Sequence, residues 1–286
     1  MAVITVENLS HTYSAGTPFE KQAICGISAE IGAGESISVL GHTGSGKTTF
    51  VQHLNALLQP NEGRVLLDGE DINKNKYTRR DVKHRVGLVF QYPEYQLFEE
   101  TVFEDISFGP RNMKLGKLEI EERVWEAASF CGIEEGLMQR SPLELSGGQK
   151  RRIAIAGVIA MRPEILILDE PTAGLDPAGS RQIMENIENY RKSSGATVMI
   201  VTHSMDDAAR YSNRLMVFDH GRLRMDGSPE DVFSKENELR SIGLDIPAAM
   251  ELAAALRGRG IPLEGTIFTH EQLLGAIRKS REVPAC

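Results

Sequence analysis

Residues 41–48 read Gly41-His42-Thr43-Gly44-Ser45-Gly46-Lys47-Thr48, and this stretch decides the fold. An apolar segment, Ser36-Ile37-Ser38-Val39-Leu40, leads directly into it, and apolar residues at helical spacing follow from Thr48 to Leu58. Glycines let the backbone turn successive N–H groups toward one point, and the start of a helix adds the positive end of its dipole. A loop of this kind between a strand and a helix binds nucleotide phosphates. We therefore predict an α/β nucleotide-binding fold built around this loop.

The last residues of the loop predict MgATP as its ligand. Lys47 can reach the β- and γ-phosphates, which also makes it a candidate catalytic residue, and the Thr48 hydroxyl is a ligand for Mg²⁺. The predicted phosphate site comprises residues 41–48 and Thr49. An ordinary Gly-Ser turn is the alternative, and the flanking strand and helix argue against it.

A second motif, Ile165-Leu166-Ile167-Leu168-Asp169-Glu170, ends an apolar strand with two carboxylates. The carboxyl edge of a parallel sheet is where α/β proteins bind their ligands. Asp169 is suited to hold Mg²⁺, and Glu170 is suited to act as the general base for an attacking water. An acidic pair alone would be a solvated strand end, but the glycine loop in the same chain favours the catalytic interpretation.

The third motif is Leu145-Ser146-Gly147-Gly148-Gln149, at the start of a predicted helix that runs to Met161. A serine cap and two glycines at a helix N-terminus predict a second anion site. A single nucleotide does not obviously need two such sites.

Composition and charge exclude several classes of function. The 286 residues include 32 Lys and Arg against 40 Asp and Glu, a net charge of −8, which disfavours nucleic acid and anionic lipid as partners. We expect no signal peptide and no membrane span, since the longest uncharged apolar stretch, Ile153 to Met161, is about half of the roughly 20 residues required. Cys25, Cys131 and Cys286 are expected to be reduced thiols. The histidines show no ligand spacing, so we assign them no metal.

Periodicity and turn residues predict the other elements. Further strands are expected at residues 3–6, 24–31, 64–69, 86–90, 165–168 and 197–201, and a hairpin at 214–225. Helices are expected within residues 95–160, most clearly at 120–131, and Ser228 is expected to cap another. From about Ser234 the chain forms a separate region with helices at 248–256 and 269–279.

Together these motifs resemble the ATP-binding cassette (ABC) ATPases over residues 2–235. The resemblance implies a P-loop NTPase with a RecA-like parallel-sheet core, an N-terminal antiparallel β subdomain and an inserted helical subdomain. The ATPase domain would span 1–233, with the helical subdomain at about 95–160, and residues 234–286 would form a helical dimerisation region. A solvated helical extension is the alternative for that last region.

The resemblance also assigns further site residues. Tyr13 stands where the family places an aromatic ring against adenine, and Gln91 where a glutamine contacts Mg²⁺ and the water. His203 matches the histidine that contacts the γ-phosphate, and Ala173-Gly174-Leu175-Asp176 matches the D-loop. Ser146 and Gly148 would contact ATP on a second cassette, because the family's cassettes pair head to tail. A P-loop kinase, the rival with the same loop, has no use for this motif.

Finer similarity points to the ATPases of energy-coupling factor (ECF) importers, chiefly the second of their two paralogues. It is carried by the block Phe90 to Phe98, by Phe108-Gly109-Pro110 and by Thr172 to Pro177. The resemblance implies a partner ATPase (a paralogue or a second copy), a transmembrane coupling subunit, a membrane subunit that captures a vitamin or similar micronutrient, and a peripheral location on the cytoplasmic face of the cell membrane. Cobalt or nickel importer ATPases and soluble, non-transport ABC ATPases are the alternatives.

Overall fold

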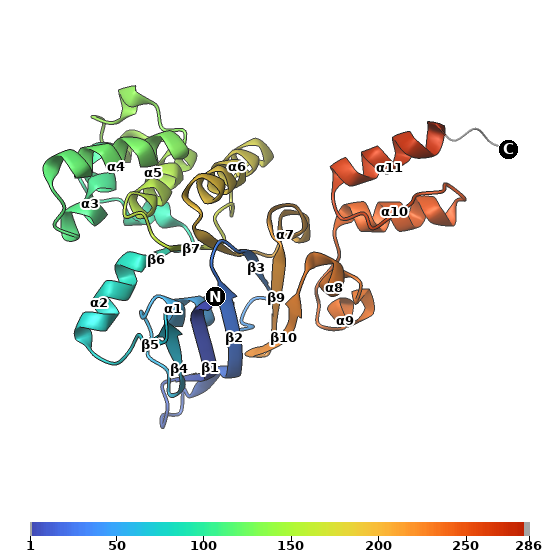
Figure 1. The fold of residues 1–286 in the computed structure, drawn as a ribbon, viewed down its shortest axis with the longest axis horizontal. Coiled ribbons are helices and arrows are strands. Elements are labelled where there is room, and N and C mark those ends of the chain that lie inside the picture. The colour runs from blue at the N-terminus through green and yellow to red at the C-terminus, as the bar shows by residue number, and fades with distance from the viewer. Residues whose placement is uncertain (1, 283–286) are drawn as a thin grey trace.

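The computed structural model describes residues 2–282. Met1 and residues 283–286, which include Cys286 and the end of the predicted C-terminal region, lie outside the described residues. Within the described part, two sheets and eleven α-helices form the fold shown in Figure 1.

The first sheet is antiparallel, with the strand order β2-β1-β4-β5. Its strands are β1 (Ala2–Tyr13), β2 (Lys21–Gly32), β4 (Glu62–Leu67) and β5 (Glu70–Asp71). Alternate residues such as Ile4, Val6 and Ile27 are buried, because successive side chains of a strand point to opposite faces. The sequence predicted shorter strands in β1 and β2, since their polar outer faces interrupt the apolar pattern.

The second sheet has the order β10-β9-β3-β8-β7-β6, and all its neighbours are parallel except β10 and β9. Its strands are β3 (Ser36–Leu40), β6 (Val86–Val89), β7 (Ile165–Asp169), β8 (Thr197–Val201), β9 (Arg214–Asp219) and β10 (Arg222–Gly227). Ile165 and Ile167 belong to one hydrophobic core, whereas Leu166 and Leu168 belong to another. Both faces of β7 are therefore covered, as its continuous apolar run predicted.

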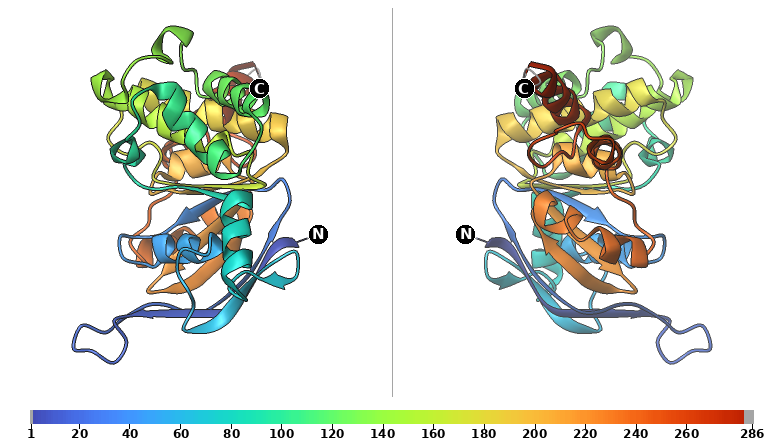
Figure 2. Two further views of the ribbon diagram at one scale, coloured as in Figure 1. Left: turned by 90° about the vertical axis from the view of Figure 1, so that its left-hand side faces the viewer. Right: turned by 90° about the vertical axis from the view of Figure 1, so that its right-hand side faces the viewer.

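The first sheet and a few helices cover one face of this central sheet, and a larger group of helices covers the other, as both views in Figure 2 show. The helices are α1 (Lys47–Leu54), α2 (Lys76–Arg85), α3 (Val102–Asn112), α4 (Lys117–Phe130), α5 (Gly147–Ile159), α6 (Pro177–Ser194), α7 (Met205–Tyr211), α8 (Pro229–Phe233), α9 (Glu236–Ser241), α10 (Ala248–Gly258) and α11 (His270–Glu282). One core joins α1 to the first sheet, and the other joins α3, α4, α5 and α6 to the far face. No helix within residues 2–282 is long and apolar enough to cross a membrane.

The predicted end of the first helix at Leu58 is wrong, because α1 stops at Leu54. Ala56 adopts a left-handed conformation with φ 54°, and the N–H groups of Leu57 and Ala56 turn back to the carbonyls of Gln52 and His53. This is the Schellman arrangement that ends many helices, usually with glycine at the left-handed position. Because this position holds alanine, the sequence contains no glycine that would indicate the end of the helix.

The C-terminal elements pack in two steps. Buried residues of α8 and α9, such as Phe233 and Leu239, share a core with Leu215 and Val217 of β9. A smaller separate cluster holds α10 and α11 together through residues such as Ala253 and Leu273. In Figure 1 these two helices extend to one side of the molecule, away from the helical lobe α3–α5.

Candidate functional site

The glycine loop connects β3 to α1 at the carboxyl edge of the central sheet. Lys47 crosses it, with Nζ donating to the carbonyls of Gly41 at 2.7 Å and His42 at 3.0 Å. Its side chain is buried, and burial lowers the pKa of Lys47, opposed by the charges of Glu170 and Asp169. Gly46 precedes the helix at the N-cap position and has no side chain to cap it, so the first N–H groups of α1 remain available to a phosphate.

Two glycines of the loop are required by close packing as well as by backbone conformation. A Cβ atom on Gly41, where φ is 148°, would lie 2.4 Å from the carbonyl oxygen of Phe218. One on Gly46, where φ is 103°, would lie 2.7 Å from the carbonyl oxygen of Ala23. Ser45 Oγ is buried and has no hydrogen-bond partner within residues 2–282, which fits a site made for an external ligand.

Thr48 and Asp169, both predicted metal ligands, are in direct contact. Thr48 Oγ1 donates to Asp169 Oδ2 at 2.8 Å, although 121 residues separate them. Burial raises the pKa of Asp169, and the Thr48 hydrogen bond partly offsets this effect. A hydroxyl and a buried carboxylate are oxygen ligands of the kind that Mg²⁺ prefers, so the residues present fit the ion. Gln91 is exposed, and no hydrogen bond of the described residues joins it to this pair.

Glu170 and His203 also come together. His203 Nδ1 lies 2.7 Å from Glu170 Oε2. Glu170 has a left-handed backbone with φ 52°, and its N–H donates to the carbonyl of Val201 in β8 at 2.9 Å. Parallel pairing of β7 with β8 explains the contact, because the two strands end at the same edge. A carboxylate and an imidazole beside the phosphate loop form an arrangement that can deprotonate a water.

The predicted adenine site lies beside the same loop. A cavity of about 160 Å³ is lined by Tyr13, Lys21, Ala23, Gly44, Gly46, Lys47, Thr48 and Thr49. Tyr13 is half-exposed, and its hydroxyl lies 3.2 Å from Thr49 Oγ1. Lys21 is a lining residue that the sequence did not single out, since a lysine on the outer face of a strand carries no motif.

Ser146 and Gly148 lie in a different hollow. Ser146 Oγ accepts from the Gln149 N–H at 3.3 Å, and Gln149 Oε1 accepts from the Ser146 N–H at 2.9 Å, so the predicted serine cap is confirmed. This hollow of about 700 Å³ is also lined by the D-loop residues 173–176, and none of its lining residues belongs to the glycine loop. The structure thus does not bring the two anion sites together within one chain.

The surroundings of Gly147 and Gly148, the two glycines of the signature motif Leu145–Gln149, indicate an external contact. A Cβ atom on Gly147 would have no atom within 4 Å, and one on Gly148 would meet only Leu175, at 3.9 Å. Neither residue has a positive φ, so nothing among residues 2–282 demands glycine there. Open backbone at a helix N-terminus is suited to close approach by an anionic group from outside.

Arg151 is a residue of this region that the sequence analysis missed. Its side chain is 2% exposed, and its guanidinium binds both carboxylate oxygens of Glu94, at 2.8 and 3.0 Å. It also donates to the carbonyls of Pro171 and Ala173. Arg151 therefore joins α5, the 3₁₀ helix Pro93–Gln96 after Gln91, and the D-loop. Arg151 lies in the basic run Lys150-Arg151-Arg152, and nothing in that run indicates that one of its arginines is buried.

A phosphate loop, a carboxylate pair and a histidine at the carboxyl edge of a parallel sheet define a P-loop ATPase. The sequence matches the ABC transporter family over residues 24–173. It is also 50% identical to the energy-coupling factor transporter ATP-binding protein EcfA2 of Symbiobacterium thermophilum, covering 96% of this chain and 95% of that protein. The chain belongs to the ABC transporter family and, within it, to the ATP-binding proteins of energy-coupling factor transporters. Its activity is ATP hydrolysis coupled to transport.

Solved structures agree with this fold. CbiO1 of Clostridium perfringens, described as part of the ABC transporter complex cbiONQ, superimposes with a TM-score of 0.74 at 41% identity, covering 84% of this chain and 94% of that one. The ATP-binding cassette MJ0796, described as a dimer in a post-hydrolysis state bound to ADP and Pi, gives a TM-score of 0.71 at 27% identity, with coverages of 79% and 98%. The predicted fold class is confirmed.

Proposed function

We propose that the chain is one half of a cassette dimer in an ECF importer, in which MgATP closes the dimer and hydrolysis opens it. The observation that carries this proposal is the division of the site. The glycine loop lines one cavity and contacts Asp169 through Thr48, whereas the open signature glycines line a separate hollow. Head-to-tail pairing with a second cassette would complete each ATP site.

Each site residue has a role in this proposal. Tyr13 stacks on adenine, residues 41–49 bind the phosphates, and Lys47 neutralises charge on the β- and γ-phosphates. Glu170 accepts a proton from the attacking water, and His203 holds the Glu170 carboxylate in place and contacts the γ-phosphate. Thr48, Asp169 and Gln91 would hold Mg²⁺, which supplies charge neutralisation at the phosphates.

The second cassette contributes the other face of the ATP. Ser146 and Gly148 of that subunit bind the γ-phosphate through backbone N–H groups and the start of α5. Because the γ-phosphate bridges the subunits, its release removes the contact and lets the dimer open. We further propose that residues 1–233 form the ATPase domain and that residues 234–286 help to hold the dimer together.

Transport requires membrane partners, since the chain supplies ATP hydrolysis alone in this proposal. A transmembrane coupling subunit docks beside the Gln91 segment, a second membrane subunit captures the micronutrient, and the cassette dimer lies on the cytoplasmic face of the cell membrane. Exposed aromatic residues support the docking site. Tyr95, within the 3₁₀ helix that Arg151 holds, is 85% exposed, and Phe98, two residues after that helix, is 65% exposed. Large exposed apolar side chains gathered in one place mark protein contacts.

Purification of the tagged chain from its native membranes in mild detergent tests the proposal. We expect an integral membrane protein to copurify with the wild type and with Tyr77→Glu, a change at another aromatic that is 85% exposed, on α2. Phe98→Glu should lose that partner. If no integral membrane protein copurifies with the wild type, the importer proposal is overturned in favour of a soluble ABC ATPase.

A further inference from the structure

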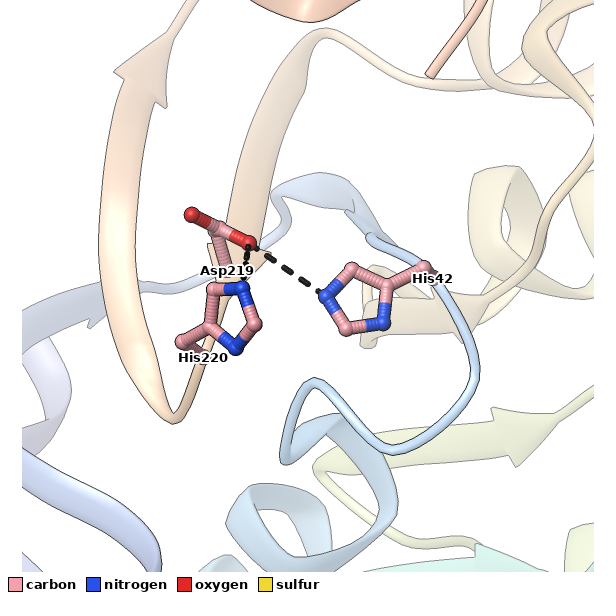
Figure 3. Close-up of side chains that lie close together, drawn as sticks. All are labelled: His42, Asp219 and His220. Atoms are coloured by element: carbon pink, nitrogen blue, oxygen red, sulfur yellow. Dashed lines mark hydrogen bonds and ion pairs between the residues drawn. The ribbon is translucent and has the colours of Figure 1, made fainter. Parts of the chain in front are cut away.

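Three side chains able to bind a metal meet next to the glycine loop. His42 lies in the loop, Asp219 ends β9, and His220 lies in the turn to β10 (Figure 3). His42 Nε2 is 3.3 Å from Asp219 Oδ1, and His220 Nε2 is 3.7 Å from the same oxygen. The three atoms lie within 4.8 Å of one another. Spacing along the chain could not show this, because 177 residues separate His42 from Asp219.

The hydrogen bonds of His42 present a conflict that a cation would resolve. Its Nδ1 lies 2.9 Å from the carbonyl oxygen of Thr43, which can only accept, so this nitrogen carries a hydrogen. Its Nε2 faces the Asp219 carboxylate, which is also an acceptor. A neutral imidazole has a single N–H and cannot donate to both partners, whereas a metal ion bound at Nε2, like a second proton there, would make both contacts favourable. An Nδ1–H held by a carbonyl, with Nε2 directed at a metal, is the usual arrangement of a ligating histidine.

The distances suit a small transition-metal ion. Bonds of about 2.0–2.1 Å in a tetrahedral site place neighbouring ligand atoms about 3.3–3.4 Å apart. The His42–Asp219 distance of 3.3 Å already matches this edge. His220 is slightly too far away, but its side chain is 85% exposed and can rotate toward the other two. The fourth position would be open to water.

The backbone already holds the two segments together. The Gly221 N–H donates to the carbonyl of Ser45 at 3.0 Å, and the Cys25 N–H donates to the carbonyl of Gly221 at 2.8 Å. Gly41 lies so close to Phe218 that a Cβ atom would clash with its carbonyl. A metal ion would therefore join neighbours that already touch, without a large rearrangement.

We propose that His42, Asp219 and His220 bind a divalent transition-metal ion such as Zn²⁺ and that the bound ion ties the phosphate loop to the β9–β10 turn. Two imidazoles and one carboxylate select Zn²⁺ and its neighbours over Mg²⁺, so this site is distinct from the one at Thr48 and Asp169. Because His42 belongs to the phosphate loop, the ion restrains the loop and slows ATP turnover.

Calorimetric titration of the nucleotide-free full chain with Zn²⁺, in excess Mg²⁺, tests the site. We expect one equivalent to bind the wild type, and His220→Ala and Asp219→Asn to weaken binding by at least about tenfold. His270→Ala removes an exposed histidine elsewhere, and Cys25→Ser removes the thiol of a residue whose backbone bonds to Gly221; both should bind like the wild type. Wild-type affinity in His220→Ala, or a loss in either control, would overturn the proposed ligands.

A second pair of measurements separates this site from the nucleotide site. Bound Co²⁺ should give the intense visible absorption of four-coordinate cobalt in the wild type, and Asp219→Asn should lose it. With saturating MgATP, Zn²⁺ should lower the ATPase rate of the wild type but not of His220→Ala, whose rate without Zn²⁺ should be unchanged. Equal inhibition of both proteins would mean that Zn²⁺ acts by replacing Mg²⁺, and the restraint by the proposed site would be refuted.

Discussion

At the scale of single residues, Glu170 is the most constrained member of the site. A left-handed φ in a residue other than glycine costs on the order of 1 kcal/mol, and such strain gathers at functional sites. In Glu170 this backbone conformation ends the extended strand β7, and the carboxylate lies within hydrogen-bond distance of His203. The strained backbone thus places the proposed general base where the strand ends.

Glu170→Gln should retain ATP binding and lose turnover by at least about a hundredfold, because an amide cannot accept the proton of the water. Phosphate release measures the rate, and size-exclusion chromatography in ATP should show dimers accumulating. Glu164→Gln, at the opposite end of β7, is the control and should keep the wild-type rate. Substantial hydrolysis by Glu170→Gln would remove Glu170 from its role.

His53 is a buried histidine whose charge state affects stability. Its Nδ1 is 2.7 Å from the carbonyl of Thr49, and its Nε2 is buried without a hydrogen-bond partner in the described part of the chain. Protonation would bury an unpaired N–H and a charge, so burial lowers the pKa of His53 below its ordinary value of 6.5. The neutral form fits the core behind Thr49, which lines the nucleotide cavity.

The lowered pKa predicts a pH dependence. The unfolded chain binds the proton at higher pH than the folded one, so the stabilisation is fully present above pH 6.5 and is lost as the pH falls toward the lowered pKa. Over this pH range the free energy of unfolding of the wild type should rise with pH by up to about 1.4 kcal/mol per pH unit because of His53, and His53→Gln should remove this contribution. Urea unfolding between pH 7.5 and 5.5 measures it, with His84→Gln on α2 as control; identical slopes in wild type and His53→Gln would contradict the account.

At the scale of elements, Arg151 connects three segments that belong to different parts of the site. It fixes the signature helix α5 to Glu94, in the segment that follows Gln91, and to the carbonyls of Pro171 and of Ala173 in the D-loop. A buried ion pair moves as a unit, because separating it would leave a charge without a partner in the interior. Movement of the Gln91 segment by a membrane partner would therefore be transmitted to the signature motif.

Arg151→Met should lower the free energy of unfolding by about 3 kcal/mol, because the Glu94 carboxylate loses its partner. Adding Glu94→Gln should recover part of this loss. Arg152→Met changes the next residue of α5, whose guanidinium bonds only to Gln182 among the described residues, and should cost less than about 1 kcal/mol. Denaturant unfolding checks all three, and equal effects of the two arginine changes would contradict the coupling.

At the scale of the whole molecule, Ser146 should be needed for pairing rather than for binding ATP. Ser146→Arg introduces a large cation into the hollow that we propose receives the second subunit's ATP, so we expect unchanged nucleotide affinity by calorimetry but no closed dimer and little turnover. Ser129→Arg, on an exposed position of α4, is the control. Wild-type turnover in Ser146→Arg would refute the shared site.

The C-terminal helices offer a second test of pairing. Leu252 on α10 and Leu274 on α11 are 49% and 56% exposed, although each lies beside the small cluster that joins the two helices. Leu252→Glu and Leu274→Glu should each weaken self-association by roughly tenfold, about 1.4 kcal/mol. Leu118→Glu, at an exposed leucine of the helical lobe, should leave it unchanged. Analytical ultracentrifugation decides between this role and that of a solvated extension.

The sequence by itself determined the parallel-sheet core and the phosphate loop, because these depend on local rules. The loop needs glycines between a strand and a helix, and a strand covered on both faces must be apolar throughout. Helix α6 went unpredicted although Asp176, Pro177 and Gly195 mark its two ends, since its outer face is strongly polar. The order of the ABC motifs along the chain identified the family.

Only the tertiary structure decided which distant residues meet. Thr48 with Asp169, Glu170 with His203, Arg151 with Glu94, and His42 with Asp219 all join segments far apart in the chain. The order of the central strands brings together the residues at the edge of the sheet, and the packing of α5 on the 3₁₀ helix brings Arg151 to Glu94; neither arrangement leaves a local pattern of residues. It also separates the loop at Gly41–Thr48 from the signature motif at Ser146, and this separation supports the proposal that a second cassette completes each ATP site.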